Sequence, residues 1–235
     1  MLAMQGICGS AEILKKRLDQ MTKALLLDMD GTVTDTEKYY NSAFTEVMHE
    51  IGYPEFKKED ALIHRSLNHT DARAYYKKKY GESFDWDMVH ERTGQLVKEY
   101  SKNYGIQVKS GFFELMDFCK EKKIRTAIVT ATGMADAKIR LEAAGVIDFF
   151  SDIISAHDVK RGKPYPDPYL FALETLKLSA GDCITVEDSP NGIYSSVAAG
   201  IRTIMVPDLS EPDDELKKVL FSVCSDLSEV RRYLN

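Results

Sequence analysis

The segment ALLLDMDGT, residues 24–32, gives the clearest indication of fold in this chain of 235 residues. Four apolar residues are followed by Asp28, Asp30 and Gly31. This pattern is typical of a short buried parallel strand that ends in a loop. The same pattern of an apolar run that stops abruptly predicts further strands along the chain. They are expected at 124–130, 152–155, 183–187, 201–206 and, more weakly, 221–224.

Helical patterns lie between these runs. The segment 134–144 carries Ile139 and Leu141 near helical spacing, and Gly145 is a natural stop for it. Strand and helix therefore alternate through the second half of the chain, which predicts an α/β fold with a doubly wound, Rossmann-like parallel sheet. Two further helices are expected at 168–178 and 192–199.

Residues 36–108 break this alternation. They show little alternation of strand type, and residues 40–51 repeat apolar side chains at helical spacing. We therefore expect a helical subdomain inserted after the first strand. The core of the fold then consists of 23–35 and 109–235, and residues 1–22 form an N-terminal extension.

Composition restricts the class of protein. The net charge of −6 gives no reason to expect a nucleic-acid partner. No stretch approaches the ~20 apolar residues of a membrane span, and the first twenty residues lack the pattern of a secretory signal. We expect a cytoplasmic protein, monomeric by default for this architecture. Its widely spaced cysteines are expected as free thiols: Cys8, Cys119, Cys183 and Cys224.

Two carboxylates follow the first strand. In open parallel sheets ligands bind at the carboxyl ends of strands, where Asp28 and Asp30 lie. Two acids so close repel each other when ionised, and a divalent cation removes that repulsion. Magnesium prefers such hard oxygen ligands. Gly31 then allows a tight turn, and Thr32 offers a hydroxyl and an amide to a phosphate, although such a pair can also simply cap a helix.

Polar residues also stand at or near the ends of other expected elements. Thr130 could donate to a phosphate oxygen, and Lys163 could neutralise charge between a carboxylate and a phosphate. Glu187 and Asp188 resemble a second set of metal ligands. Each has an ordinary alternative as a strand residue, a solvated lysine or a turn. Together they predict a site in which one divalent cation and Lys163 offset converging carboxylates and a phosphate.

These segments, in this order, resemble the motifs of the haloacid dehalogenase superfamily, and within it the branch of β-phosphoglucomutases and sugar-phosphate phosphatases. The insert at 36–108 matches the cap of this branch in position. The resemblance extends from about residue 23 to the C-terminus. The matching segments are LLLDMDGTVTDTE (25–37), Thr130, GKPYPDPYLFAL (162–173) and VEDSPNGI (186–193).

The resemblance implies a role for each carboxylate. Asp28 is the nucleophile that forms an aspartyl-phosphate. Asp30 protonates the leaving oxygen and then activates water. The Asp28 carboxylate, the Asp30 main-chain carbonyl and Asp188 bind Mg2+, and Glu187 acts mainly through a bound water.

The resemblance also assigns the substrate contacts. Thr130 and Lys163 would hold the phosphoryl oxygens and stabilise developing charge. The function expected is therefore that of a magnesium-dependent phosphatase that hydrolyses a small phosphate monoester, a sugar phosphate or related metabolite. The other expected substrate-binding residues are Gly31, Thr32 and Ala131 in the core and Arg65 in the cap.

The sequence also bears on three functions other than hydrolysis of a phosphate ester. Mutases of this branch carry a histidine in the first cap helix and a Lys-Gly-x-x-Arg element in the cap. In an ungapped register Tyr40 stands at the histidine position, and residues 64–68 (HRSLN) replace the element. Both departures favour a phosphatase over a mutase. Asp30 argues against a dehalogenase. The helical insert and the motif order argue against a non-catalytic phosphate-binding or phospho-acceptor protein such as a receiver domain.

Overall fold

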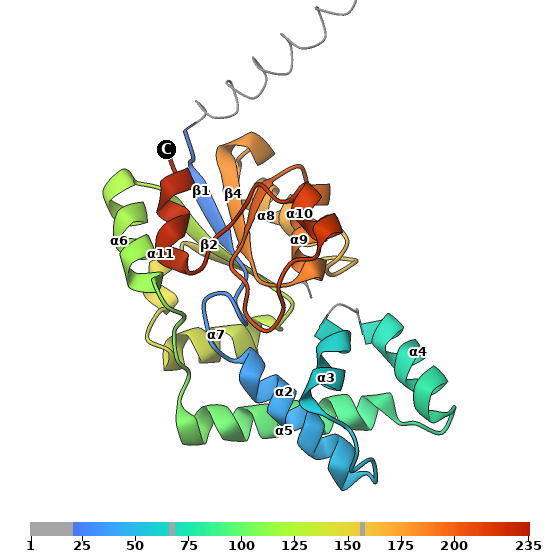
Figure 1. Ribbon diagram of the computed structural model, residues 1–235. Coiled ribbons are helices and arrows are strands. Elements are labelled where there is room, and N and C mark those ends of the chain that lie inside the picture. The colour runs from blue at the N-terminus through green and yellow to red at the C-terminus, as the bar shows by residue number, and fades with distance from the viewer. Residues whose placement is uncertain (1–20, 66–68, 156–157) are drawn as a thin grey trace, which may run out of the picture.

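The computed structural model describes residues 21–65, 69–155 and 158–235, and within them the core is a six-stranded sheet (Figure 1). The strand order is β3-β2-β1-β4-β5-β6, and every pairing is parallel. This confirms the expected α/β fold, and each strand lies where an apolar run predicts one. The strands are β1 (Ala24–Leu27), β2 (Arg125–Thr130), β3 (Asp152–Ser155), β4 (Cys183–Glu187), β5 (Arg202–Met205) and β6 (Ser222–Val223).

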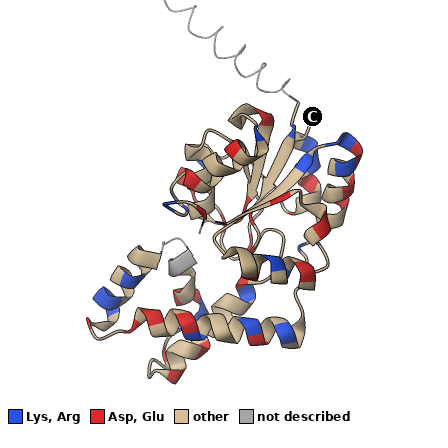
Figure 2. Cartoon of the chain, turned by 180° about the vertical axis from the view of Figure 1, so that it is seen from behind, with Lys and Arg blue, Asp and Glu red and all other residues tan. Residues whose placement is uncertain are grey.

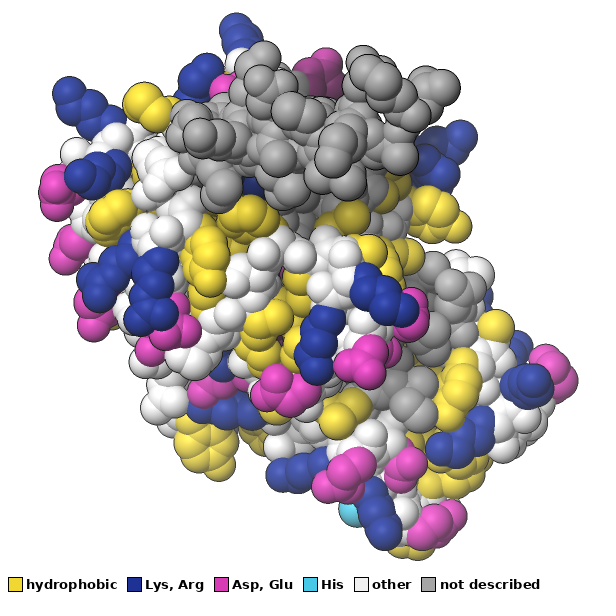
Figure 3. All heavy atoms as spheres, turned by 45° about the horizontal axis from the view of Figure 1, so that its top comes forward, with side chains coloured by type: hydrophobic (Ala, Val, Ile, Leu, Met, Phe, Trp, Pro, Cys, Tyr) yellow, Lys and Arg dark blue, Asp and Glu magenta, His cyan; other side chains and the backbone are white. Residues whose placement is uncertain are grey.

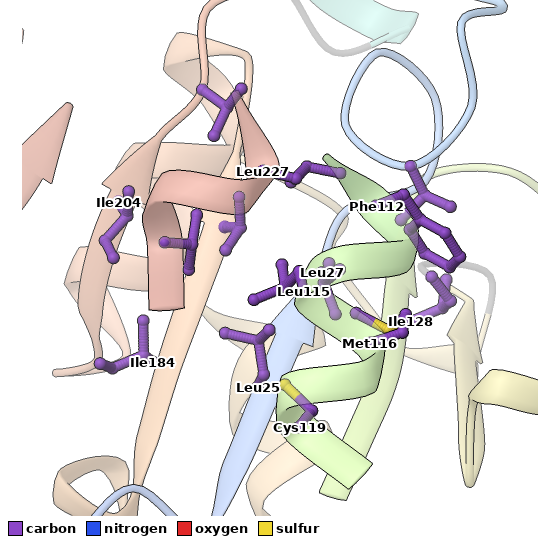
Figure 4. Packing of buried hydrophobic residues seen from close by; sticks show 14 of the residues in the cluster. Leu25, Leu27, Phe112, Leu115, Met116, Cys119, Ile128, Ile184, Ile204 and Leu227 are labelled. Atoms are coloured by element: carbon purple, nitrogen blue, oxygen red, sulfur yellow. The ribbon is translucent and has the colours of Figure 1, made fainter. Parts of the chain in front are cut away.

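Helices cover both faces of the sheet because alternate side chains of each strand point to opposite faces. Leu25 and Leu27 pack with α6, α7 and α11 on one face, and Figure 4 shows α6 and α11 over the strands. Ala24 and Leu26 pack with α8 on the other face. These helices are α6 (Phe112–Lys122), α7 (Met134–Ala143), α8 (Asp167–Leu176), α9 (Pro190–Ala198), α10 (Asp214–Val219) and α11 (Leu227–Val230); short 3-10 turns span Ile147–Phe149, Ala180–Asp182 and Arg231–Tyr233.

The buried face of α7 contains a charged side chain. Ile139 is 61% exposed, whereas Arg140 is only 7% exposed. The helix buries Ala137, Arg140 and Leu141, which lie on one side at helical spacing. The expected helix is therefore present, but its buried face includes a charged side chain and excludes Ile139.

The segment 36–108, which follows β1, is helical as expected. Its helices lie below the sheet in the view of Figure 1, on the side where the strands end. Their interior is aromatic: the ring of Tyr76 lies 5.4 Å from that of Phe44 and 5.1 Å from that of Trp86. The limits of the cap at 36–108 stay our proposal. The helices are α2 (Glu37–Glu50), α3 (Lys58–Arg65), α4 (His69–Tyr80) and α5 (Trp86–Tyr104).

The two crossings between sheet and cap helices lie side by side. Thr34 and Val108 form an antiparallel bridge. The Asp35 amide donates to the Gln107 carbonyl at 2.9 Å, and the Lys109 amide donates to the carbonyl of Val33, also at 2.9 Å. The outgoing and returning chains therefore support each other, and they hold the start of α2 near the ends of the strands.

The surface carries both signs of charge. Along the helices seen in Figure 2, acidic and basic residues are interspersed in both the core and the cap. Exposed hydrophobic side chains lie among charged ones on the face shown in Figure 3, which is ordinary for a protein surface. The monomeric state stays a prediction.

Two further expectations concern the chain as a whole. Within the described residues no helix is both long and apolar enough to cross a membrane. Cys119, Cys183 and Cys224 are free and buried, as expected. Cys8 and nearly all of the expected N-terminal extension, residues 1–20, lie outside the described residues.

Candidate active site

The register of the sheet brings the first two carboxylates together. Leu27 of β1 pairs with Val186 of β4, so the next residues, Asp28 and Glu187, emerge beside each other. The Asp28 amide donates to the Val186 carbonyl at 3.0 Å, which continues the pairing by one residue. Asp28 is 8% exposed and Glu187 is fully buried. The parallel pairing of β1 and β4 therefore places Asp28 and Glu187 at the same edge of the sheet.

Lys163 lies between these acids. Its Nζ donates to Asp28 Oδ1 at 2.6 Å, to Glu187 Oε1 at 2.6 Å and to the Val129 carbonyl at 2.9 Å. Its side chain is only 7% exposed. The Tyr169 hydroxyl donates to the same Glu187 oxygen at 2.5 Å. The loop before α8 and the first turn of that helix thus supply a cation and a hydroxyl to the acids of β1 and β4.

In this group two carboxylates, those of Asp28 and Glu187, share the single positive charge of Lys163. Burial raises the pKa of Asp28 to about 8, Lys163 opposes that rise, and Glu187 and Asp30 add to it. Burial by itself lowers the pKa of Lys163, but Asp28 and Glu187 more than offset this, and the pKa stands above its ordinary value. Lys163 is therefore charged, and because two carboxylates share it, a further cation would favour their ionised forms.

The residues present fit a magnesium ion. One carboxylate oxygen each from Asp28, Glu187 and Asp188 lie within 4.8 Å of one another. Glu187 Oε2 is buried and accepts no hydrogen bond from any described residue. Clustered carboxylate oxygens are the hard donors that magnesium binds, and a buried carboxylate oxygen needs a partner. The donor set thus suits the cation expected from the sequence.

Two glycines allow the acidic loops to approach closely. Gly31 has φ +88°, and a Cβ there would lie 2.3 Å from Asp188 Oδ2. A Cβ on Gly192, in the first turn of α9, would lie 2.0 Å from the carboxyl carbon of Glu187. Any larger residue would displace these carboxylates, so both positions need glycine.

The expected phosphate contacts are placed as follows. Thr130 ends β2 and is buried, and its Oγ1 accepts a hydrogen bond from the Thr132 amide at 3.0 Å. Thr32 is fully buried, with a hydroxyl that has no hydrogen-bond partner in the part of the chain that the structure describes. Ala131, which follows Thr130 in the chain, is exposed. The side chain of Arg65, at the end of α3, lies outside the described residues.

Asp30 has a separate set of partners. Its Oδ1 accepts hydrogen bonds from Thr36 Oγ1 at 2.5 Å and from Arg140 Nη1 at 2.8 Å. Its Oδ2 accepts one from Thr132 Oγ1 at 2.8 Å. Arg140 Nη2 donates to the Tyr40 hydroxyl at 2.9 Å. The two acids of the first motif are therefore bound to different cations.

Four of these partners were not found by sequence reasoning: Thr36, Thr132, Arg140 and Tyr169. A signal existed for Arg140, because it is in helical phase with Ala137 and Leu141. A charged residue on the buried face of a helix requires a buried partner. The identity of that partner could not be found locally, since Asp30 lies 110 positions away.

A parallel sheet whose strand ends gather an acidic pair, a threonine, a lysine and a second acidic pair defines an α/β enzyme of phosphoryl transfer. Comparison with known proteins gives the family. Residues 25–206 match the model of the haloacid dehalogenase-like hydrolases, and the chain belongs to that family. It is accordingly a phosphohydrolase, as the motifs predicted.

Relatives from several organisms support this assignment. The chain is 32% identical over 216 residues to the plasmid-encoded protein CbbY of Cupriavidus necator, covering 84% of this chain and 83% of that protein. It is 33% identical over 198 residues to hexitol phosphatase A of Escherichia coli, covering 81% and 88%. A solved structure described as a putative β-phosphoglucomutase from Bacteroides vulgatus shares the fold, with a TM-score of 0.75, 22% identity and coverage of 94% and 93%.

Proposed function

We propose that this protein is a magnesium-dependent phosphatase that hydrolyses a small phosphate monoester, a sugar phosphate or a related metabolite, through an aspartyl-phosphate at Asp28. The observation that carries the proposal is the buried Lys163, with Nζ 2.6 Å from both Asp28 and Glu187. A buried ammonium at a strand end can bind a phosphoryl oxygen while it orients the carboxylate that attacks. The hexitol phosphatase among the relatives supports the substrate class.

The proposed reaction has two halves. Asp28 attacks phosphorus, so an oxygen–phosphorus bond forms to its carboxylate and the ester bond breaks. Asp30 gives a proton to the departing alkoxide, and it later takes one from the water that hydrolyses the aspartyl-phosphate. Lys163 and Thr130 hold the phosphoryl oxygens, where negative charge develops.

Magnesium, when bound by Asp28, Asp188 and the Asp30 carbonyl, with Glu187 acting mainly through a water, would supply neutralising charge beside the phosphoryl group. Among the described residues near the site, Lys163 alone compensates Asp28 and Glu187 directly. The protein's contribution is to place these donors rigidly, with Gly31 and Gly192 allowing the close approach.

Release of inorganic phosphate from a panel of phosphorylated metabolites tests the proposed function and its dependence on metal. We expect excess chelator to lower the rate on the order of 10²-fold and magnesium to restore it, since metal charge contributes several kcal/mol to such reactions. Calcium should restore little, because its bonds are longer and its coordination more variable. Full activity in excess chelator, with an unchanged melting curve, would contradict metal dependence, and no release from any metabolite would contradict the phosphatase.

The same protein should act as a phosphatase and not as a mutase. The hydroxyl of Tyr40, at the position of the mutase histidine, accepts a hydrogen bond from Arg140. We expect β-glucose 1-phosphate, supplied with a trace of the bisphosphate, to yield no glucose 6-phosphate: free phosphate accumulates, or there is no reaction if this sugar is not a substrate. Rapid, stoichiometric conversion to glucose 6-phosphate without phosphate release would show that a sugar hydroxyl outcompetes water, and would make the protein a mutase.

A further inference from the structure

Arg140 is a buried cation that none of the family motifs identified in the sequence contains. It projects from α7, and its side chain is 8% exposed. Nη1 donates to Asp30 at 2.8 Å and Nη2 to the Tyr40 hydroxyl at 2.9 Å. The guanidinium carbon also lies 5.4 Å from the centre of the Tyr40 ring. One side chain thus connects the loop after β1, the first cap helix α2 and a core helix.

Burial of a guanidinium is unfavourable unless it forms hydrogen bonds. Here the guanidinium of Arg140 donates to the carboxylate of Asp30 and to the phenol of Tyr40. Two threonine hydroxyls already donate to Asp30, that of Thr36 to Oδ1 and that of Thr132 to Oδ2. The need of Asp30 for hydrogen-bond donors therefore does not by itself explain why Arg140 is buried here. Its distinctive effect is geometric, because it ties Asp30 to a specific place and to the cap.

The two oxygens of Asp30 have different surroundings. Oδ1 accepts hydrogen bonds from Arg140 and from Thr36. Among the described residues, Oδ2 accepts a hydrogen bond from the neutral hydroxyl of Thr132, which can rotate. A cation at Oδ1 fixes that oxygen, and a rotatable neutral partner leaves Oδ2 able to exchange partners. The asymmetry distinguishes the oxygen that is held from the oxygen that can reach a substrate.

We propose that Arg140 is a positioning residue for Asp30: it holds Oδ1, so that Oδ2 faces the leaving oxygen of the ester, and through Tyr40 it couples this placement to the cap. The inference rests on the proposed phosphatase function, in which Asp30 protonates the leaving group. Arg140 belongs to the core and Tyr40 to α2 of the cap. A movement of α2 that separated them would remove one of the two partners of the guanidinium.

A comparison of two esters tests this role. One is the sugar phosphate that the wild-type protein hydrolyses fastest, whose alkoxide needs a proton to leave. The other is p-nitrophenyl phosphate, whose phenolate leaves readily without one. The parameter is kcat/KM, which reports on the steps up to transfer of the phosphoryl group and not on the later attack of water.

For Arg140→Met we expect kcat/KM to fall on the order of 10²-fold for the sugar phosphate and far less for p-nitrophenyl phosphate, since general acid catalysis contributes about that much. Lys138→Met, an exposed change on the same helix, is the matched control and should change neither. Arg140→Lys keeps the charge but has no fork to reach two partners, so it should recover part of the loss for the sugar phosphate.

Tyr40→Phe removes only the hydroxyl that accepts from Arg140, and it serves as the test if Arg140→Met does not fold. We expect a smaller loss in the same direction, again confined to the sugar phosphate. Equal losses on both esters, or none on either, would overturn the positioning role. Hydrolysis of neither ester by the wild-type protein would instead overturn the proposed function, so the two failures are distinguishable.

Discussion

Replacing Asp28 with asparagine should abolish phosphate release and leave the fold intact. The change keeps the size of the side chain but replaces a carboxylate with an amide, which cannot form the acyl phosphate. We expect turnover to fall by on the order of 10⁴-fold or more, as is usual when a covalent nucleophile is removed. The fold should persist because Asp28 is an unfavourably buried carboxylate that shares its cation with Glu187.

Three measurements check this result: phosphate release, a thermal melting curve and mass spectrometry of acid-quenched protein. The wild-type protein should carry phosphate on Asp28 after quenching, and the variant should carry none. Asp148→Asn is the matched control, since Asp148 is exposed and lies in the short 3-10 turn Ile147–Phe149, outside the site. A pure, folded Asp28→Asn protein with turnover near that of the wild type would disprove the covalent mechanism.

The sheet could be predicted from the sequence because each parallel strand is buried on both faces. A strand of that kind is a short apolar run, and ALLL at Ala24–Leu27 and CITVE at Cys183–Glu187 show this directly. Strand order was not predicted, since it depends on pairings between distant segments. Three helices after β2, namely α7, α8 and α9, were located to within two residues because glycine and proline mark their ends, whereas α10 and α11 were not predicted.

Part of the candidate site could likewise be predicted from local sequence, and part could not. Asp28, Lys163, Glu187 and Asp188 come together as expected, because parallel strands bring their carboxyl ends to one edge. The roles assigned to them stay predictions. What local patterns could not show is the set of partners around Asp30. Those contacts depend on how α7 packs against the loop after β1 and against α2. The periodicity of apolar residues in the sequence says little about such packing between distant segments.

The structure gives the two acids of the first motif different environments. Asp28 shares Lys163 with Glu187, whereas Asp30 has Arg140 and two threonine hydroxyls. Neighbouring carboxylates can serve as nucleophile and as acid–base group only when their surroundings differ in this way. The cation of Asp28 comes from the core loop before α8, and that of Asp30 contacts the cap through Tyr40. Under the proposed mechanism, movement of the cap would therefore affect proton transfer by Asp30 more directly than nucleophilic attack by Asp28.

Lys163→Met should impair both catalysis and folding. Loss of the ammonium that we propose binds the transferring phosphoryl group should lower kcat on the order of 10³-fold. Removal of one partner from a buried ion pair should also lower the free energy of unfolding by about 3–5 kcal/mol, because Asp28 and Glu187 then face each other without their shared cation. Methionine approximates the length and apolar stem of lysine, so little of the effect should come from an empty space.

Phosphate release and chemical denaturation measure the two effects, each with and without magnesium. Magnesium should recover part of the stability, since it neutralises the same carboxylates, but not the rate, since it cannot replace the ammonium at Nζ. Lys160→Met, an exposed change in the same loop, should alter neither quantity. Lys163→Arg should also remain slow, because a guanidinium is too large for a position that lysine fills at 7% exposure. A Lys163→Met protein as stable and as active as the control would show that Asp28 and Glu187 are compensated by other groups, and the proposed role of Lys163 would be wrong.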